Sequence, residues 1–270
     1  MLISKLKTSI KIFKERGLKS LFIHLFKKLI NFKRPSKNKY FHEINRCVIN
    51  EKNTFHLNIA KELANAVFYV YGMGVKGDIA EFGTMTGRSA VALSKASALC
   101  EIDYRNDPRA LKNLHFFDSF EGLPEARFDI DISSPHVLEG TWREGSCKGL
   151  SKNGFTKLIS RYINNKKFKV YKGWFKDTVQ QINANIIFSL VHIDGDLYES
   201  AIDVLDFLFK KKKISKGAIL LFDDWNCNAS NPNLGEKRAF KEVCNKYKIK
   251  FSDEGSYSFN AHKFIIHSYE

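Results

Sequence analysis

The sequence lacks the features that mark secreted, zinc-ribbon and membrane-spanning proteins. Its five cysteines are odd in number and include no C-x-x-C pair. This pattern argues against a disulfide framework or a zinc ribbon, and for reduced thiols in a cytoplasmic compartment. No run approaches the roughly 18 apolar residues that a membrane helix needs, and no signal peptide with a cleavage site is visible. We therefore expect a cytoplasmic protein.

The G-x-G-x-x-G pattern for binding a pyrophosphate is also missing, because Met85 occupies the place of the close-approach glycine. Residues 77–89 instead form a short apolar strand and two glycines, Gly83 and Gly87, that lead into a helical pattern. Glycine lets the backbone turn sharply and approach a ligand, and a helix N-terminus offers free amides. Taken alone, such a glycine pair is a weak signal for a nucleotide-type ligand.

The next predicted strand, 114–117, is followed by Asp118. In a doubly wound fold, an acidic residue at this place binds the ribose hydroxyls of a nucleotide-type ligand. The alternative is that Asp118 is an N-cap or turn residue.

Two acidic pairs, about thirty residues apart, each follow an apolar, β-branched run. They are Asp194 with Asp196, and Asp223 with Asp224. Runs of this kind predict strands buried in a parallel sheet, and open α/β sheets bind ligands at the carboxyl ends of their strands. Four carboxylates in a small volume need a cation or a shared proton, and hard oxygen ligands suit Mg²⁺, Ca²⁺ or Mn²⁺. The alternative is that Asp194 caps the following helix and the second pair lies in a solvated turn.

Positive charge is concentrated at the start of the chain. Residues 1–40 hold twelve Lys and Arg and one acidic residue, Glu15, which accounts for +11 of the formal net charge of +15. The apolar residues that follow the spacing of one helix face are Leu18, Leu21, Phe22, Leu25, Phe26 and Leu29. A basic amphipathic helix of this kind can lie in the interface of an anionic membrane. The alternative is that this face docks on the domain or on a second subunit. A nucleic-acid partner is disfavoured, because the rest of the chain is nearly neutral.

After this arm, predicted strands and helices alternate. The expected strands are 79–83, 114–118, 168–173, 186–193, 217–222, 248–252 and 262–267, and the expected helices are 61–71, 87–99, 152–163, 175–183, 198–211 and 235–247. This order predicts an α/β fold with a doubly wound, mostly parallel sheet and an antiparallel C-terminal strand. We expect one domain at 41–270 after a helical arm at 1–40. The connection between Ser119 and Lys152 is longer than usual, so we expect it to be functional, for example as a substrate lid.

Five motifs in this order resemble the macrocin O-methyltransferase (TylF) family over roughly residues 55–255. They are Glu81-x-Gly83-x-x-x-Gly87-x-Ser89, Phe117-Asp118-Ser119-Phe120-Glu121-Gly122-Leu123-Pro124, Lys172-Gly173-Trp174-Phe175, Ile193-Asp194-x-Asp196-x-Tyr198 and Phe222-Asp223-Asp224-Trp225. The basic arm lies outside the resemblance. The family implies a Rossmann-like enzyme that uses S-adenosylmethionine and Mg²⁺ (or Mn²⁺) to methylate sugar hydroxyls.

The resemblance also implies a role for individual residues. Cofactor contacts are expected from Glu81, Gly83, Thr84, Gly87, Ser89, Asp118, Ser119, Trp174 and Asp194. Among these, Glu81 would receive the amino group and Asp118 the ribose, while Trp174 would face the adenine or else be a buried core residue. Metal ligands are expected at Asp194, Asp223 and Asp224, and the general base at Asp196.

Two other functions compete with this interpretation. Asp194-Gly195-Asp196 is also the D-x-D signature of some metal-dependent glycosyltransferases, although that function leaves Gly83 and Gly87 without a role. A non-catalytic membrane-binding protein is the other alternative. If the chain is a methyltransferase, the acceptor is a sugar-containing small molecule or a lipid-linked glycan. The acceptor belongs either to a bacterial surface glycan precursor made at the inner membrane face or to a glycosylated natural product. Self-association stays open.

Overall fold

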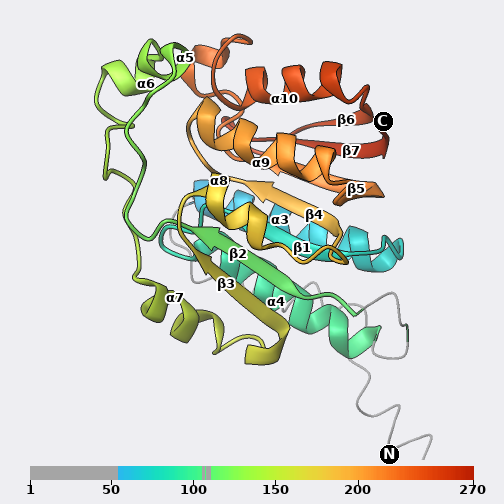
Figure 1. Cartoon of the computed structure of the whole chain (residues 1–270). Coiled ribbons are helices and arrows are strands. Elements are labelled where there is room, and N and C mark those ends of the chain that lie inside the picture. Colours follow the sequence, from blue (N-terminus) through green and yellow to red (C-terminus); the bar gives the residue numbers. More distant parts are fainter. Residues whose placement is uncertain (1–53, 105–106, 108–110) are drawn as a thin grey trace, which may run out of the picture. The chain divides into compact units, whose positions relative to one another are not determined.

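The computed structural model describes residues 54–104, 107 and 111–270 (Figure 1). The predicted arm at 1–40 and the domain boundary after it lie outside these residues. Among the described helices, none is both long and apolar enough to cross a membrane.

Seven strands form one sheet in the order β3-β2-β1-β4-β5-β7-β6. Their bounds are β1 Asp78–Phe82, β2 Leu114–Asp118, β3 Phe168–Lys172, β4 Phe188–Ile193, β5 Ile214–Phe222, β6 Lys250–Ser256 and β7 His262–Ser268. The first five strands are parallel, and β7 runs antiparallel to both of its neighbours. All six residues of β4 are buried, as expected for a central strand covered on both faces. The predicted fold class is therefore confirmed.

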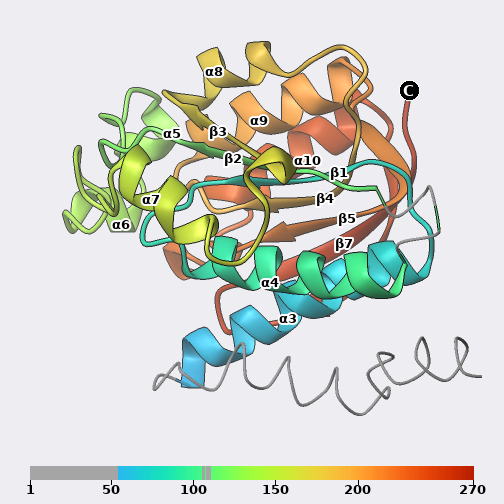
Figure 2. The same ribbon diagram turned by 90° about the horizontal axis from the view of Figure 1, so that it is seen from below.

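Helices cover both faces of the sheet, with α3 and α4 on one face and α8, α9 and α10 on the other (Figure 2). Their bounds are α3 Thr54–Gly72, α4 Arg88–Asp103, α7 Lys152–Ile159, α8 Phe175–Thr178, α9 Tyr198–Lys210 and α10 Gly235–Lys246. Each face has its own apolar core, which includes Leu63 and Leu93 on one side and Leu205 and Val243 on the other.

Several predicted elements differ in their bounds. The helix expected at 61–71 begins earlier, at Thr54, the helix expected at 152–163 ends earlier, at Ile159, and the strand expected at 248–252 extends to Ser256. The helix expected at 175–183 is the short α8 followed by a 3₁₀ turn, Val179–Gln181. Thr178 Oγ1 donates to the carbonyl of Trp174 at 3.0 Å, and such back-bonding competes with regular helix geometry. The strand expected at 217–222 begins earlier, at Ile214, because Gly217 adopts φ 82° and lets the strand continue through an irregularity.

The connection between β2 and α7 contains two short helices, α5 (Asp129–Ile132) and α6 (Pro135–Leu138). We call residues 119–151 the lid segment. In Figure 1 it lies on the side of the sheet to which the arrowheads of the parallel strands point. The segment therefore lies at the edge where the sequence places its candidate ligand-binding residues.

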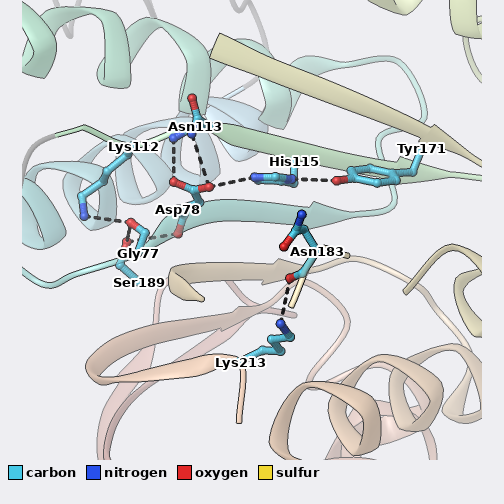
Figure 3. Close-up of polar contacts among 9 residues, drawn as sticks. All are labelled: Gly77, Asp78, Lys112, Asn113, His115, Tyr171, Asn183, Ser189 and Lys213. Atoms are coloured by element: carbon cyan, nitrogen blue, oxygen red, sulfur yellow. Dashed lines mark hydrogen bonds and ion pairs between the residues drawn. The ribbon is translucent and has the colours of Figure 1, made fainter. Parts of the chain in front are cut away.

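A polar network extends from the amino ends of β1 and β2 to Tyr171 of β3 (Figure 3). His115 joins Asp78 Oδ2 through Nε2 and Tyr171 Oη through Nδ1, each at 3.0 Å. Asn113 N donates to Asp78 Oδ1 at 2.9 Å, and the fully buried Lys112 donates to the carbonyls of Val75 and Gly77. Because these polar groups bind one another, we assign them a structural role.

Candidate functional site

A cavity of about 900 Å³ opens at the carboxyl ends of the parallel strands. Each of the five parallel strands contributes to its wall a residue at or just after its carboxyl end. In the strand order β3-β2-β1-β4-β5, these residues are Gly173, Asp118, Gly83, Asp194 and Asp223. Of the predicted site residues, those that line it are Gly83, Thr84, Gly87, Ser89, Asp118, Ser119, Trp174, Asp194, Asp196, Asp223 and Asp224. The glycine turn and both acidic pairs therefore share one cavity.

Gly83 brings the glycine turn and the first acidic pair into contact. It adopts φ 93°, and a Cβ at this position would lie 1.7 Å from the Asp194 carbonyl oxygen. Asp194 N in turn donates to the carbonyl of Phe82 at 2.8 Å. Glycine is required here because the ends of β1 and β4 pack closely against each other. The sequence predicted glycine at this position for a different reason, the approach of a ligand to the backbone.

The first turn of α4 lies at the cavity and has no side-chain cap at its N-terminus. Its N-cap is Gly87, which has φ 78° and no side chain that could accept the first N–H groups of the helix. Arg88 and Ser89 both line the cavity beside it. Uncapped amides at the positive end of a 16-residue helix suit a carboxylate ligand.

Asp118 organises the glycine turn. Its Oδ2 accepts the amides of Thr84 and Met85 at 2.7 and 3.1 Å and the Thr84 hydroxyl at 3.0 Å. Its Oδ1 accepts the amide of Phe120 at 2.5 Å. Asp118 is therefore a turn residue, as the alternative held. A carboxylate oxygen can accept more than one bond, so Oδ1 keeps capacity for a ribose hydroxyl, and that contact stays a prediction.

Replacing Asp118 with Ala should weaken S-adenosylmethionine binding roughly tenfold or more, since it removes charge-assisted bonds that hold the turn. Calorimetric titration of the cofactor in chelator measures this. Glu121→Ala is the matched control, because Glu121 is exposed on the same turn and lies outside the cavity wall. Equal affinity of wild type and Asp118→Ala would remove Asp118 from the cofactor site.

Glu81 is fully buried against His192, with Oε1 3.0 Å from Nδ1. It is not among the residues that line the cavity, so its predicted contact with the cofactor amino group stays a prediction. Burial alone would lower the pKa of His192, but the bond to Glu81 and the charges of Glu81 and Asp223 raise it above its ordinary value. His192 lines the cavity, and its Nε2 lies 4.0 Å from Asp223 Oδ1.

The two acidic pairs form one cluster. Carboxylate oxygens of Asp194, Asp196 and Asp224 lie within 4.8 Å of one another, an arrangement that could hold a metal ion. Asp223 lies beside them in the cavity wall. Among the residues that the structure describes, Asp223 Oδ1 and Asp224 Oδ2 are buried without a hydrogen-bond partner. Unpartnered, buried carboxylate oxygens fit a hard divalent cation.

The pKa values of these carboxyls are raised, which is expected where carboxylates lie close together without a cation. Burial, together with repulsion from Asp223 and Asp224, raises the pKa of Asp194 well above its ordinary value. Burial and the neighbouring Asp224 do the same to the pKa of Asp196, and burial with Asp224 raises that of Asp223 to about 6. Without a cation, the cluster therefore tends to retain protons near neutral pH.

Stability should accordingly depend on pH in the cation-free protein. The pKa of Asp223 is about 6 in the folded protein against 3.8 as the ordinary value, so its stabilising contribution is lost as pH rises between them. The raised pKa of His192 acts in the same direction. The stability that protonated His192 contributes at low pH is lost as pH rises through its pKa in the folded protein.

The measurement is urea unfolding in EDTA at about pH 5 and about pH 8. We expect lower stability at the higher pH, and a smaller difference with Mg²⁺, because a cation that binds the ionised cluster stabilises the folded state. Stability that increases with pH in EDTA would contradict the charge arrangement.

The site also includes residues that belong to none of the predicted site positions, among them Glu236 and His56. Glu236 is 1% exposed, accepts the amide of Asp224 at 3.1 Å through Oε2 and has a buried, unpartnered Oε1 among the described residues. It lies in the first turn of α10, the helix after β5, and this position relative to the strand end could have identified it. His56 of α3 lines the cavity, and its charge acts to lower the pKa of Asp223. No pattern in the sequence indicated His56.

Comparison with known proteins agrees with this geometry. The sequence profile of the macrocin-O-methyltransferase (TylF) family matches residues 57–248. The 8-demethyl-8-(2,3-dimethoxy-α-L-rhamnosyl)-tetracenomycin-C 4′-O-methyltransferase of Streptomyces olivaceus is 27% identical over 169 residues, which are 61% of this chain and 59% of that enzyme. The demethyldecarbamoylnovobiocin O-methyltransferase of Streptomyces niveus is 26% identical over 190 residues, 70% of this chain and 68% of that enzyme.

Among solved structures, the O-methyltransferase NovP superposes with a TM-score of 0.62 at 22% identity, over 78% of this chain and 81% of NovP. This likeness supports the fold. The family match covers well over half of the chain and all five motifs, and it disfavours the glycosyltransferase and the non-catalytic alternatives. The chain therefore belongs to the macrocin-O-methyltransferase (TylF) family.

Proposed function

We propose that the protein transfers a methyl group from S-adenosylmethionine to a sugar hydroxyl with the help of Mg²⁺ or Mn²⁺. One observation carries the proposal: the glycine turn and the acidic cluster are neighbours in a single cavity, joined by the contact of Gly83 with Asp194. A cofactor bound on the turn would therefore present its methyl group beside the carboxylates. Family membership supports the cofactor and the reaction class.

The order of residues along the sheet edge suggests how the ligands lie. Trp174, half-buried in the cavity wall after β3, suits the adenine, and Asp118 after β2 suits the ribose. The methionine part would then lie at Gly83 and the first turn of α4, where the positive end of the helix suits its carboxylate. This leaves the end of the cavity near Asp194 and Asp223 for the acceptor, with His56 of α3 in its wall.

Chemistry requires an acceptor oxygen in line with the sulfur–methyl bond and a group that removes the hydroxyl proton. The cavity wall at Gly83, Asp118 and Trp174 would hold S-adenosylmethionine, which when bound would supply the electrophilic methyl group to the hydroxyl oxygen. We assign the proton to the Asp196 carboxylate. Its backbone φ of 59° is a left-handed conformation that costs energy in a non-glycine residue, a feature that clusters at active sites.

A divalent cation held by Asp194, Asp223 and Asp224 would supply positive charge that orients the acceptor and lowers the pKa of its hydroxyl. The unpartnered oxygens of Asp223 and Asp224 support these ligands. Asp196 is the alternative third ligand, because its carboxylate lies within 4.8 Å of those of Asp194 and Asp224. Glu236 binds the Asp224 amide and would hold that ligand in place.

The acceptor class follows from the relatives. One of them is named for O-methylation of a rhamnosyl-bearing tetracenomycin, which supports a sugar hydroxyl on a small molecule. The basic composition of residues 1–40 favours an acceptor presented at the anionic inner face of a bacterial membrane, such as a surface glycan precursor. A glycosylated natural product is the second candidate.

Mass spectrometry of glycans from cells with and without the protein tests the proposal. We expect the loss of one methyl group from one sugar when the protein is absent, and its return with the wild-type gene but not with an Asp196→Asn gene. Unchanged methylation of both surface glycans and glycosylated small molecules would contradict the proposed function.

A further inference from the structure

Helix α9 begins without a cap of its own. Leu197 occupies its N-cap position and has no side-chain acceptor for the first amides. Asp131, in α5 of the lid segment, accepts the amides of Tyr198 and Glu199 at 2.7 and 3.0 Å. Its side chain is buried, with 2% of the residue exposed. The lid segment therefore provides the missing cap from 67 residues away in sequence.

A second contact ties the lid segment to the other acidic pair. His136 donates its backbone N–H to Asn228 Oδ1 at 3.2 Å, and its Nδ1 lies 2.9 Å from the same oxygen. Asn228 is 2% exposed and has φ 55°, and Ala229 and Ser230 after it have φ 54° and 59°. Three consecutive non-glycine residues in the left-handed region are strained and need outside contacts to persist. This strained turn begins four residues after Asp224.

A third contact joins the lid segment to the glycine turn. Leu150 N donates to the Met85 carbonyl at 2.9 Å. A Cβ on Gly149 would lie 2.0 Å from that carbonyl oxygen, so the two backbones pack directly. The lid segment thus contacts the residues that follow each acidic pair as well as the proposed cofactor turn.

We infer that Asp131 and His136 are positioning residues, which order the two acidic pairs for cation binding when the lid segment is docked. The inference rests on the proposed function, because it assigns the acidic pairs to a cation. Asp196 lies two residues before the amides that Asp131 caps, and Leu197 N donates to the Gly195 carbonyl at 2.6 Å. Loss of the cap would let the start of α9 fray into this turn, and the turn carries Asp194 and Asp196.

Docking of the lid segment and order in the acidic cluster are therefore two parts of one equilibrium. A cation that binds the ordered cluster favours the docked lid segment, and a docked lid segment raises the affinity for the cation by the same factor. The two acidic pairs would then become ordered for the cation when the lid segment covers the cavity. Order in the site would thus coincide with exclusion of water.

The test compares Asp131→Ala and Asp131→Asn with wild type, using Mn²⁺ alone as the probe, without acceptor. We expect Asp131→Ala to weaken Mn²⁺ binding by roughly two- to thirty-fold, the range that a lost helix cap implies, and Asp131→Asn to lie between, since its single oxygen can accept one of the two amides. Hydrogen exchange should accelerate at Tyr198 and Glu199. The matched control is Asp129→Asn, which removes an exposed carboxylate from the same short helix.

A residue that serves only folding would lower the unfolding midpoint without changing Mn²⁺ affinity in the folded protein, and that result would overturn the inference. His136→Ala provides an independent variant, which should also weaken Mn²⁺ binding. Should Asp131→Ala fail to fold, Asp131→Asn and His136→Ala decide the matter by the same criterion. Wild-type protein that binds neither S-adenosylmethionine nor Mn²⁺ would instead contradict the proposed function.

Discussion

Asp196→Asn should lower turnover by ~10²–10⁴-fold, the range that a general base contributes, while S-adenosylmethionine and Mg²⁺ affinities stay nearly unchanged. Asn preserves the size of the side chain and tolerates the left-handed backbone that Asp196 adopts at φ 59°. What it loses is the ability to accept the hydroxyl proton. Turnover under saturating cofactor, with calorimetry of both ligands, measures the effect.

The comparison variant is Asp223→Asn, which should weaken cation binding together with turnover. Less than about tenfold loss in Asp196→Asn, below the range of a general base, would make Asp196 a turn or capping residue. If Asp196→Asn instead loses Mg²⁺ affinity as Asp223→Asn does, Asp196 is a ligand, as its closeness to Asp194 and Asp224 allows. His192 Nε2, which lies 4.0 Å from Asp223, is then the next candidate for the proton.

Chelation should abolish methyl transfer and leave cofactor binding intact. A cation contributes several kcal/mol of charge stabilisation, so we expect EDTA to lower the rate by about 10³-fold or more. The activity should return with Mg²⁺ or Mn²⁺, because carboxylate sites prefer these ions. The assay is initial rate against added cation after exhaustive chelation. Full turnover in EDTA would remove the cation from the mechanism and leave base catalysis alone.

S-adenosylmethionine binding in the same chelated sample is the internal control. The proposed cofactor turn and the acidic cluster follow different strands, so loss of the cation should leave cofactor affinity within a few-fold. Loss of methyl transfer and of S-adenosylmethionine binding together would show that chelation had disturbed the fold. The midpoint of urea unfolding in EDTA checks for such a disturbance.

Most of the fold could be predicted from the sequence because its strands are short apolar runs separated by amphipathic helices. β4 is buried at every position and lies between β1 and β5, as its continuous apolar run predicts. Because β4 and β5 are parallel, the acidic pairs that follow them lie at the same edge of the sheet. The shared edge follows from parallel topology alone. For this reason, the order of strands and helices along the chain was enough to place the four carboxylates and the glycine turn together.

The rest of the site depends on contacts between segments that are distant in sequence. Asp131 looks like an ordinary residue of an acidic loop, and only the docking of α5 on α9 reveals it as a cap. The requirement for glycine at position 83 likewise comes from the carbonyl of Asp194, 111 residues later. The bond between Glu81 Oε1 and His192 joins residues 111 positions apart, and the expected contact of Glu81 with the cofactor stays a prediction. No periodicity or local motif encodes such pairings.

One measurement tests the central claim most directly: transfer of an isotope-labelled methyl group from S-adenosylmethionine by the purified protein, with Mg²⁺, to glycans and glycosylated small molecules extracted from cells that lack it. We predict label on an oxygen of one sugar, with one S-adenosylhomocysteine formed per methyl group and an initial rate of labelling at least ~10²-fold lower with Asp196→Asn. Label on nitrogen or carbon, or no transfer to any sugar-containing fraction, would contradict the proposed reaction.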